Sequence, residues 1–262
     1  MTNWACDEMA TADLGDRRLD ARLAKLLERI GQHPQVSIPA ACGGWAETLG
    51  AYRFFDNPKT SFEKVLAPHH DATLERVAGV PVALLVQDTT DDNKTLNLGT
   101  KGLGTIKNVD KRARRLHPTV AFTPQRICLG VVCANFWERV QPSPRGARRN
   151  KGIDEKESRY WIESYQASCA AQGKCPNTLI VNISDAEGDL YELFAEAASY
   201  ASSTRAQWIV RAAQDRLLAT AQDADAPGKL WDAVGQAPAL GDVEVEVAAR
   251  PGRTARRARD AA

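Results

Sequence analysis

The 262-residue chain lacks the patterns that identify several common classes of protein. It has no apolar run long enough to cross a bilayer and no N-terminal secretory signal, so we expect a cytoplasmic protein with no membrane partner. Its six cysteines form no C-x-x-C pair and its four histidines no H-E-x-x-H motif, so neither residue type predicts a zinc site. The net charge is +1, so the total charge of the chain cannot by itself account for binding to nucleic acid.

Basic residues are nonetheless concentrated in three segments. Residues 101–115 hold six basic side chains and one acidic, residues 139–151 hold five basic and no acidic, and residues 248–262 hold five arginines and one aspartate. Any one of these segments would fit a solvated loop. Clusters of this kind also attract phosphate backbones, so three of them together favour a nucleic acid partner.

The first 79 residues have the pattern of a small all-helical module. Five apolar residues recur at helical spacing and predict one amphipathic helix: Leu19, Leu23, Leu26, Leu27 and Ile30. A second helix is expected over residues 44–55, with these four side chains buried: Trp45, Leu49, Tyr52 and Phe55. A third helix is expected to begin at a capping box, with Thr60 as the N-cap and Glu63 as its partner, and to end near Gly79.

From Pro81 onward the pattern changes to strands and helices in alternation. Strands are expected at residues 82–87, 116–123, 127–135, 178–184 and 207–211, and helices at 153–171 and from Leu190. This order predicts an α/β fold, with a ribonuclease-H-like mixed sheet flanked by helices. We therefore predict two domains, the helical module at 1–79 and the ribonuclease-H-like core at 80–262.

Two aspartates stand at the ends of buried strands. The run Val82–Gln87 leads into Asp88, and the run Thr178–Ser184 leads into Asp185. A carboxylate at the carboxyl end of a central strand lies at the mouth of an α/β sheet, where such folds hold their ligands. Two of them can share divalent metal ions for phosphoryl transfer on nucleic acid. The alternative for each is an aspartate that only shapes the turn after its strand.

Several motifs spread over the chain resemble those of one family. They are Leu14-Gly15-Asp16-Arg17-Arg18-Leu19, Cys42-Gly43-Gly44-Trp45-Ala46-Glu47-Thr48, Ala51-Tyr52-Arg53-Phe54-Phe55-Asp56-Asn57-Pro58, Val86-Gln87-Asp88-Thr89-Thr90, Asp154-Glu155-Lys156-Glu157-Ser158 and Asp185-Ala186-Glu187-Gly188-Asp189. With these motifs the chain resembles the DDE transposases of bacterial cut-and-paste insertion sequences (the insertion-sequence-four family), in the branch that includes the Tn-five transposase. The resemblance runs from about Trp4 to the tail.

The resemblance implies a metal-dependent activity on DNA. Asp88 and Asp185 would be the catalytic aspartates and the ligands of two Mg²⁺ (or Mn²⁺) ions. The implied reaction is hydrolysis at the transposon ends followed by strand transfer. Glu187 is expected to support these ligands rather than to bind metal itself.

The resemblance also implies that the helical module binds double-stranded DNA. The partners would be the terminal inverted repeats of the transposon and the target DNA, held through phosphate and base contacts. Our candidates for DNA binding are Arg17, Arg18, Arg22, Arg53 and Lys59. Full-length members of the family act as homodimers.

The sequence departs from the family in two places. Ala186 stands where the family has an arginine, and the chain ends at Ala262, before the helix that carries the family's third acid, a glutamate. We therefore expect a C-terminally truncated transposase that is catalytically incomplete and lacks the C-terminal dimerisation region. Two alternatives remain: an inactive DNA-end-binding remnant or inhibitor of intact transposase, and a ribonuclease-H-like nuclease that recruits another acid.

Overall fold

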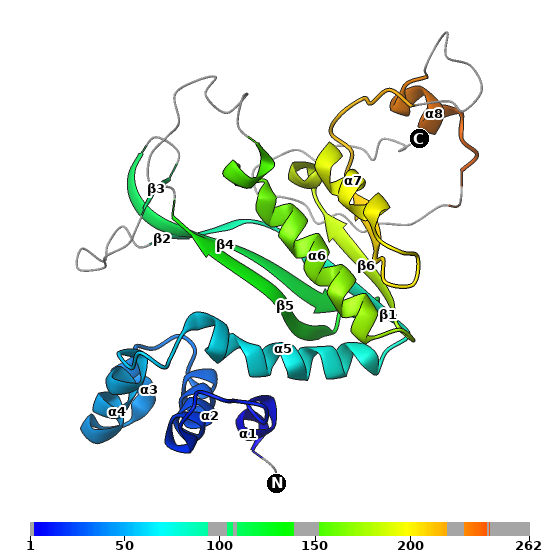
Figure 1. Cartoon of the computed structure of the whole chain (residues 1–262). Coiled ribbons are helices and arrows are strands. Elements are labelled where there is room, and N and C mark those ends of the chain that lie inside the picture. The colour runs from blue at the N-terminus through cyan, green and yellow to red at the C-terminus, as the bar shows by residue number, and fades with distance from the viewer. Residues whose placement is uncertain are drawn as a thin grey trace, which may run out of the picture. The chain divides into compact units, whose positions relative to one another are not determined.

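The computed structural model contains an N-terminal group of helices followed by a mixed sheet with helices packed on it (Figure 1). The structure describes residues 3–93, 104–106, 109–138, 152–218, 228–239 and 241. The chain divides into two compact units, Met1–Arg211 and Ala212–Ala262. The predicted domain boundary after Gly79 stays a prediction. Among the described residues, no helix is both long and apolar enough to span a membrane.

Five helices precede the sheet. They are α1 (Trp4–Glu8), α2 (Arg17–Gln32), α3 (Ile38–Cys42), α4 (Trp45–Phe55) and α5 (Phe62–Ala78). Asp16 accepts a hydrogen bond from the Arg18 backbone N–H and so caps α2, because the first turn of a helix has no internal acceptors for its N–H groups. Leu23 and Leu26 of α2 lie in one buried cluster, as the helical periodicity predicts, and Leu14, which precedes the helix, belongs to the same cluster.

The buried face of α4 differs from the one predicted. Its buried residues are Thr48, Ala51 and Phe54, whereas three predicted core residues are exposed: Trp45 (78%), Tyr52 (44%) and Phe55 (47%). Thr48 can be buried on this face because its hydroxyl donates to the Gly44 carbonyl at 2.8 Å. Phe54 packs inward, and the three aromatic side chains named above are turned outward.

The start of α5 also corrects the prediction. Its N-cap is Ser61, whose Oγ accepts a hydrogen bond from the Lys64 backbone N–H at 3.3 Å. Thr60 lies one residue too early for this role, because an N-cap side chain reaches the N–H two or three residues ahead of it. The end is as predicted, with Gly79 at the C-cap.

A polar junction joins α1, α5 and the sheet. Glu8 of α1 accepts hydrogen bonds from Arg76 (2.7 and 2.9 Å) and from His69 Nδ1 (2.5 Å), both on α5. His69 Nε2 accepts from the Val131 backbone N–H at 2.9 Å, and Arg76 Nε donates to the Leu129 carbonyl at 2.5 Å. Irregular strand pairing near Leu129 and Val131 frees these backbone groups from the sheet ladder.

The sheet is mixed and has β1 at its centre. The strands are β1 (Val82–Gln87), β2 (Thr90–Asn93), β3 (Gly104–Ile106), β4 (Val109–Phe122), β5 (Cys128–Trp137), β6 (Leu179–Ser184) and β7 (Gln207–Val210). β4 pairs antiparallel with β1 on one side and with β5 on the other, while β6 runs parallel to β1 and β7 parallel to β6. The predicted α/β class, with a mixed sheet flanked by helices, is therefore confirmed.

Three strand segments were not predicted. β2, β3 and the first half of β4 lie in a polar, basic stretch that has no apolar alternation to mark strands. Their backbones extend because they pair with one another, as in the pairing of Thr90 with Leu116. Residues 94–103, and with them part of the first basic segment, lie outside the described residues, as do 139–151 and 248–262.

Helix α6 (Arg159–Lys174) packs across β5, β4, β1 and β6, and α7 (Tyr191–Ser199) packs against α6 (Figure 1). The predicted helix at 153–171 is divided: η1 (Ile153–Glu155) forms one short turn and α6 starts at Arg159. The core between helix and sheet is formed by alternate strand residues, such as Ala83, Leu85 and Ile180, against Trp161 and Tyr165.

Candidate functional site

Asp88 and Asp185 follow neighbouring parallel strands. Val86 of β1 is paired with Ile183 of β6, so the two aspartates stand at the same level, two residues beyond that pair. Because parallel strands end at the same edge of a sheet, both carboxylates emerge at this edge. Paired residues of β1 and β6 are 97 positions apart in the chain, as Val82 and Leu179 are. The sheet thus brings together two aspartates that are equally distant in the sequence.

Each carboxylate holds the turn that follows it. Asp88 Oδ1 accepts a hydrogen bond from the Thr89 backbone N–H at 2.7 Å, and Asp185 Oδ1 accepts one from the Glu187 backbone N–H at 2.8 Å. Both aspartates are exposed. Each aspartate therefore shapes the turn after its strand, which is the alternative role described in the sequence analysis. These hydrogen bonds use the Oδ1 atoms and leave the Oδ2 atoms for an external ligand.

The turn after Asp185 is a short helical segment, η2 (Ala186–Gly188), pressed against the core. A Cβ added at Gly188 would lie 2.3 Å from Ser184 Oγ and 3.0 Å from Trp161 Cε3. Only glycine therefore fits here, and this close packing fixes where Asp185 stands relative to the sheet.

Glu187 is exposed within η2 and contributes its backbone N–H, rather than its carboxylate, to the hydrogen bond with Asp185. In the described ranges, no group of three or more His, Cys, Asp and Glu residues is arranged to hold a metal ion. The two aspartates offer hard oxygen ligands at this edge, and their chemistry suits Mg²⁺ or Mn²⁺.

A chain of buried polar side chains lies beneath the edge, and the sequence analysis missed it. His117 Nδ1 lies 2.7 Å from Thr89 Oγ1, and His117 Nε2 lies 3.0 Å from Gln87 Oε1. Gln87 Nε2 donates to Asn182 Oδ1 at 2.7 Å, and Asn182 Nδ2 donates to Ser168 Oγ at 2.9 Å. The sequence carried a signal for this chain, because Gln87 and Asn182 occupy inward positions of strands that are mostly apolar.

His117 is fully buried and packs edge-on against Trp161, with ring centroids 4.6 Å apart. Burial disfavours the charged ring and lowers the pKa of His117 to about 4, although the nearby Asp185 carboxylate acts in the opposite direction. The ring is consequently neutral at neutral pH, with one nitrogen a donor and the other an acceptor.

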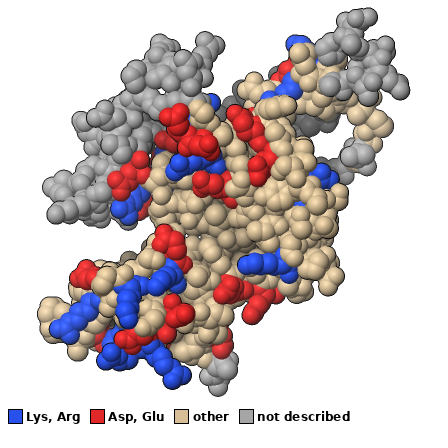
Figure 2. Space-filling model, viewed as in Figure 1, with Lys and Arg blue, Asp and Glu red and all other residues tan. Residues whose placement is uncertain are grey.

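The five candidate DNA-binding residues fall into two groups. Arg17, Arg53 and Lys59 are exposed, and Arg17 and Arg53 form no ion pair with any residue in the described part of the chain. Lys59 donates to the Gly15 carbonyl at 3.1 Å. Figure 2 shows lysine and arginine side chains gathered over the N-terminal helices.

Arg18 and Arg22 are paired within the module. Arg18 bonds Asp16 at 3.1 Å but stays 91% exposed, so it remains accessible. Arg22 of α2 bonds Glu47 of α4 at 2.7 Å, and Lys25 bonds the same carboxylate at 2.7 Å. The main role of Arg22 is therefore to join α2 to α4 through Glu47.

Two arginines of the first basic segment also have acidic partners. Arg115 bonds Asp91 at 3.1 Å and Glu157 at 2.9 Å, with its side chain only 17% exposed. Arg114 bonds Glu138 at 3.1 Å. Arg115 therefore joins the sheet to the residues just before α6. The basic cluster at residues 101–115 did not predict this structural role.

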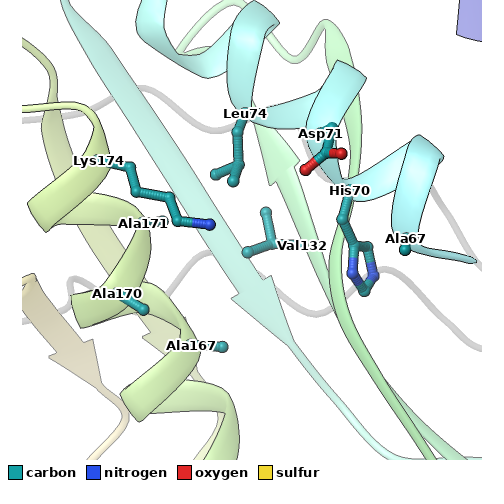
Figure 3. A pocket seen from close by; sticks show the side chains of 9 residues that line it. All are labelled: Ala67, His70, Asp71, Leu74, Val132, Ala167, Ala170, Ala171 and Lys174. Atoms are coloured by element: carbon teal, nitrogen blue, oxygen red, sulfur yellow. The ribbon is translucent and has the colours of Figure 1, made fainter. Parts of the chain in front are cut away.

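A cavity of about 250 Å³ lies between α5, β5 and α6 (Figure 3). It is lined mainly by small and apolar side chains, and His70, Asp71 and Lys174 contribute its polar atoms. Burial is the main cause that lowers the pKa of His70. Neither Asp88 nor Asp185 lines this cavity, so it is separate from the candidate metal-binding edge.

A comparison with known families bears on the helical module. Residues 1–60, which contain α1 to α4, match the family model of the transposase DNA-binding domain. The match supports a transposase, with DNA as its partner.

Proposed function

We propose that this chain is a cut-and-paste DNA transposase of the insertion-sequence-four, Tn-five-like type. The helical module binds the terminal inverted repeats, and the edge at Asp88 and Asp185 supplies two of the metal ligands for phosphodiester hydrolysis and strand transfer on terminal and target DNA. The observation that carries the proposal is the placement of both aspartates at the ends of the parallel strands β1 and β6. The match of residues 1–60 supports the DNA partner.

The metal-binding part of the proposal is supported by the chemistry of the edge. Asp88 and Asp185 would hold Mg²⁺ or Mn²⁺, since hard cations prefer carboxylate oxygens. When bound, such ions would activate a nucleophilic oxygen and stabilise the leaving oxygen of an in-line displacement. The protein positions the ligands: the Thr89 and Glu187 N–H groups orient the two carboxylates, and Gly188 keeps the second turn close to the core.

The DNA-binding part is supported by the exposed cations of the module. Arg17, Arg18, Arg53 and Lys59 are available to phosphate oxygens, whereas Arg22 acts mainly through its pair with Glu47. The outward aromatic side chains of α4 lie on the same helix as Arg53 and widen the surface that DNA can contact.

The test is strand cleavage of a duplex that carries the terminal repeat of the source element. The chain is incubated with Mg²⁺ or Mn²⁺ beside Asp88→Asn and Asp185→Asn variants, and a gel shift without metal measures binding. We expect binding by all three proteins. Cleavage by the wild type that is lost in both variants would assign both aspartates to a complete active site and contradict the incompleteness expected from the sequence.

Cleavage that survives in both variants would show that the two aspartates are not the ligands. Binding without cleavage in the wild type would instead favour the alternative function, a DNA-end-binding protein that inhibits intact transposase. Absence of binding would contradict both.

A further inference from the structure

We propose that the buried chain Thr89–His117–Gln87–Asn182–Ser168 is a positioning device that gives the Asp88–Asp185 edge a surface of hydrogen-bond acceptors only. All four interior members are essentially inaccessible to solvent, with relative exposures of 0 to 1%. The chain links four elements of the fold, β4, β1, β6 and α6. This inference deepens the proposed function and rests on it.

The direction of the chain is set at its buried end. Ser168 Oγ lies 2.9 Å from the Ser164 backbone carbonyl, which can only accept. Ser168 must therefore donate its single proton to that carbonyl, and its oxygen accepts from Asn182. A backbone carbonyl cannot exchange its roles as a side-chain amide can, so the anchor has one direction.

The same direction of hydrogen-bond donation continues through the Asn182 and Gln87 amides to the His117 ring. Asn182 donates with Nδ2, so its Oδ1 accepts from Gln87 Nε2, and Gln87 Oε1 is left to face His117 Nε2. An amide oxygen only accepts, which requires a proton on Nε2. The neutral ring then has a bare Nδ1, and this nitrogen accepts the proton of the Thr89 hydroxyl.

The consequence for the edge concerns the Thr89 hydroxyl. Its proton is directed inward to His117, so Oγ1 has only lone pairs for any further partner. Asp88 and Asp185 also offer only acceptor oxygens when ionised. In the opposite direction, the Thr89 hydroxyl would accept from His117 and direct its own proton outward, where a positive hydrogen disfavours a cation. The inferred direction therefore favours a hydrated divalent ion.

The first experiment measures the tautomer of His117 without metal. Protein labelled with ¹⁵N in its four imidazole rings is examined by NMR near neutral pH, and the His117 signals are identified by their loss in a His117→Asn variant. We expect a protonated Nε2 and an unprotonated Nδ1. A ring protonated on Nδ1 would overturn the proposal, because the chain would then run the other way.

The second experiment breaks the anchor far from the edge. Ser168→Ala removes the hydroxyl that fixes the amides, so we expect a mixture of both tautomers of His117 and an Mn²⁺ affinity lower by about tenfold, as for other groups that orient metal ligands. Ser164→Ala is the matched control, because it alters the same helix but keeps the carbonyl that accepts from Ser168. It should change neither quantity.

The outcomes separate the positioning chain from the function on which it rests. Wild-type Mn²⁺ binding that is unchanged within twofold in Ser168→Ala would overturn the positioning role and leave the proposed function standing. Wild type that binds Mn²⁺ no better than Asp88→Asn would overturn the metal site, and the positioning role with it. Thermal unfolding of each variant verifies that the fold is retained.

Discussion

Gly188 illustrates how one residue controls the position of a catalytic candidate. A side chain there would overlap Ser184 and approach Trp161, both of which are held in the core. We expect Gly188→Ala to lower the free energy of unfolding by about 1–3 kcal/mol, as for other overpacked sites, and to weaken Mn²⁺ binding because the turn after Asp185 must move. Urea denaturation and metal titration measure the two effects.

The control for this substitution is Gly152→Ala. A Cβ at Gly152 meets no atom within 4 Å, and its backbone is extended with φ −62°. Its stability should remain within about 0.5 kcal/mol of the wild type, as for ordinary surface changes. Equal losses in both variants would refute the steric explanation.

His117 gives stability a pH dependence of its own. The unfolded ring takes up a proton near its ordinary pKa of 6.5, whereas the folded ring resists it down to about 4. Stability should therefore fall as the pH decreases from about 6.5 to 4, by on the order of 3 kcal/mol, and this contribution should be constant below that range. Urea midpoints across this range should show a smaller slope for His117→Gln than for the wild type.

At the scale of elements, the junction of α1, α5 and β5 makes a second pH-dependent contribution. The hydrogen bond from Arg76 is the main cause that holds the pKa of Glu8 below 4.5, against the effect of burial. A lowered carboxyl pKa adds stability that is complete above 4.5 and is lost as the pH falls through the folded-state value.

Glu8→Gln should therefore be less stable than the wild type at pH 7 by on the order of 1 kcal/mol. The difference should shrink below pH 4.5, where the wild type also loses its charge. Chemical denaturation at pH 7 and pH 3.5 measures it. A difference that is constant with pH would indicate lost packing rather than a lost ion pair.

The helical module predicts different roles for two of its arginines. Arg17→Ala should weaken DNA binding, and it should reduce the dependence of log K on log salt by about one unit, because one phosphate contact is lost. Arg22→Ala should mainly lower the melting temperature, because it breaks the pair with Glu47 over Gly50. Fluorescence anisotropy at several salt concentrations and thermal unfolding distinguish them, and an unchanged salt dependence in Arg17→Ala would remove that residue from the interface.

The elements also mark where sequence patterns succeed and fail. β1 and β6 could be predicted because strong apolar runs lead into polar turns, and α2 because its leucines recur at helical spacing. The face of α4 could not, because Trp45, Tyr52 and Phe55 point outward, whereas Phe54 packs inward beside a threonine and an alanine. Apolarity alone does not show which of two possible faces allows close helix packing.

At the scale of the whole molecule, the order of elements predicted the α/β class and the common edge of Asp88 and Asp185. The polar chain beneath that edge escaped prediction because its members come from four elements, and only the folded register brings Gln87, His117 and Asn182 together. The junction at Glu8 is similar, since His69 and Arg76 lie more than 60 positions later in the chain.

The pairing of β1 with β6 has a consequence for the synthesis of the protein. The core of α1 to α4 uses residues no later than Val65, whereas β6 begins at Leu179. At ribosomal speeds of roughly 5–20 residues per second, the interval between them is on the order of ten seconds. The helical module can therefore fold while Asp88 still lacks its neighbour, so under the proposed function the nascent chain would be able to capture DNA close to the ribosome before the metal-binding edge has formed.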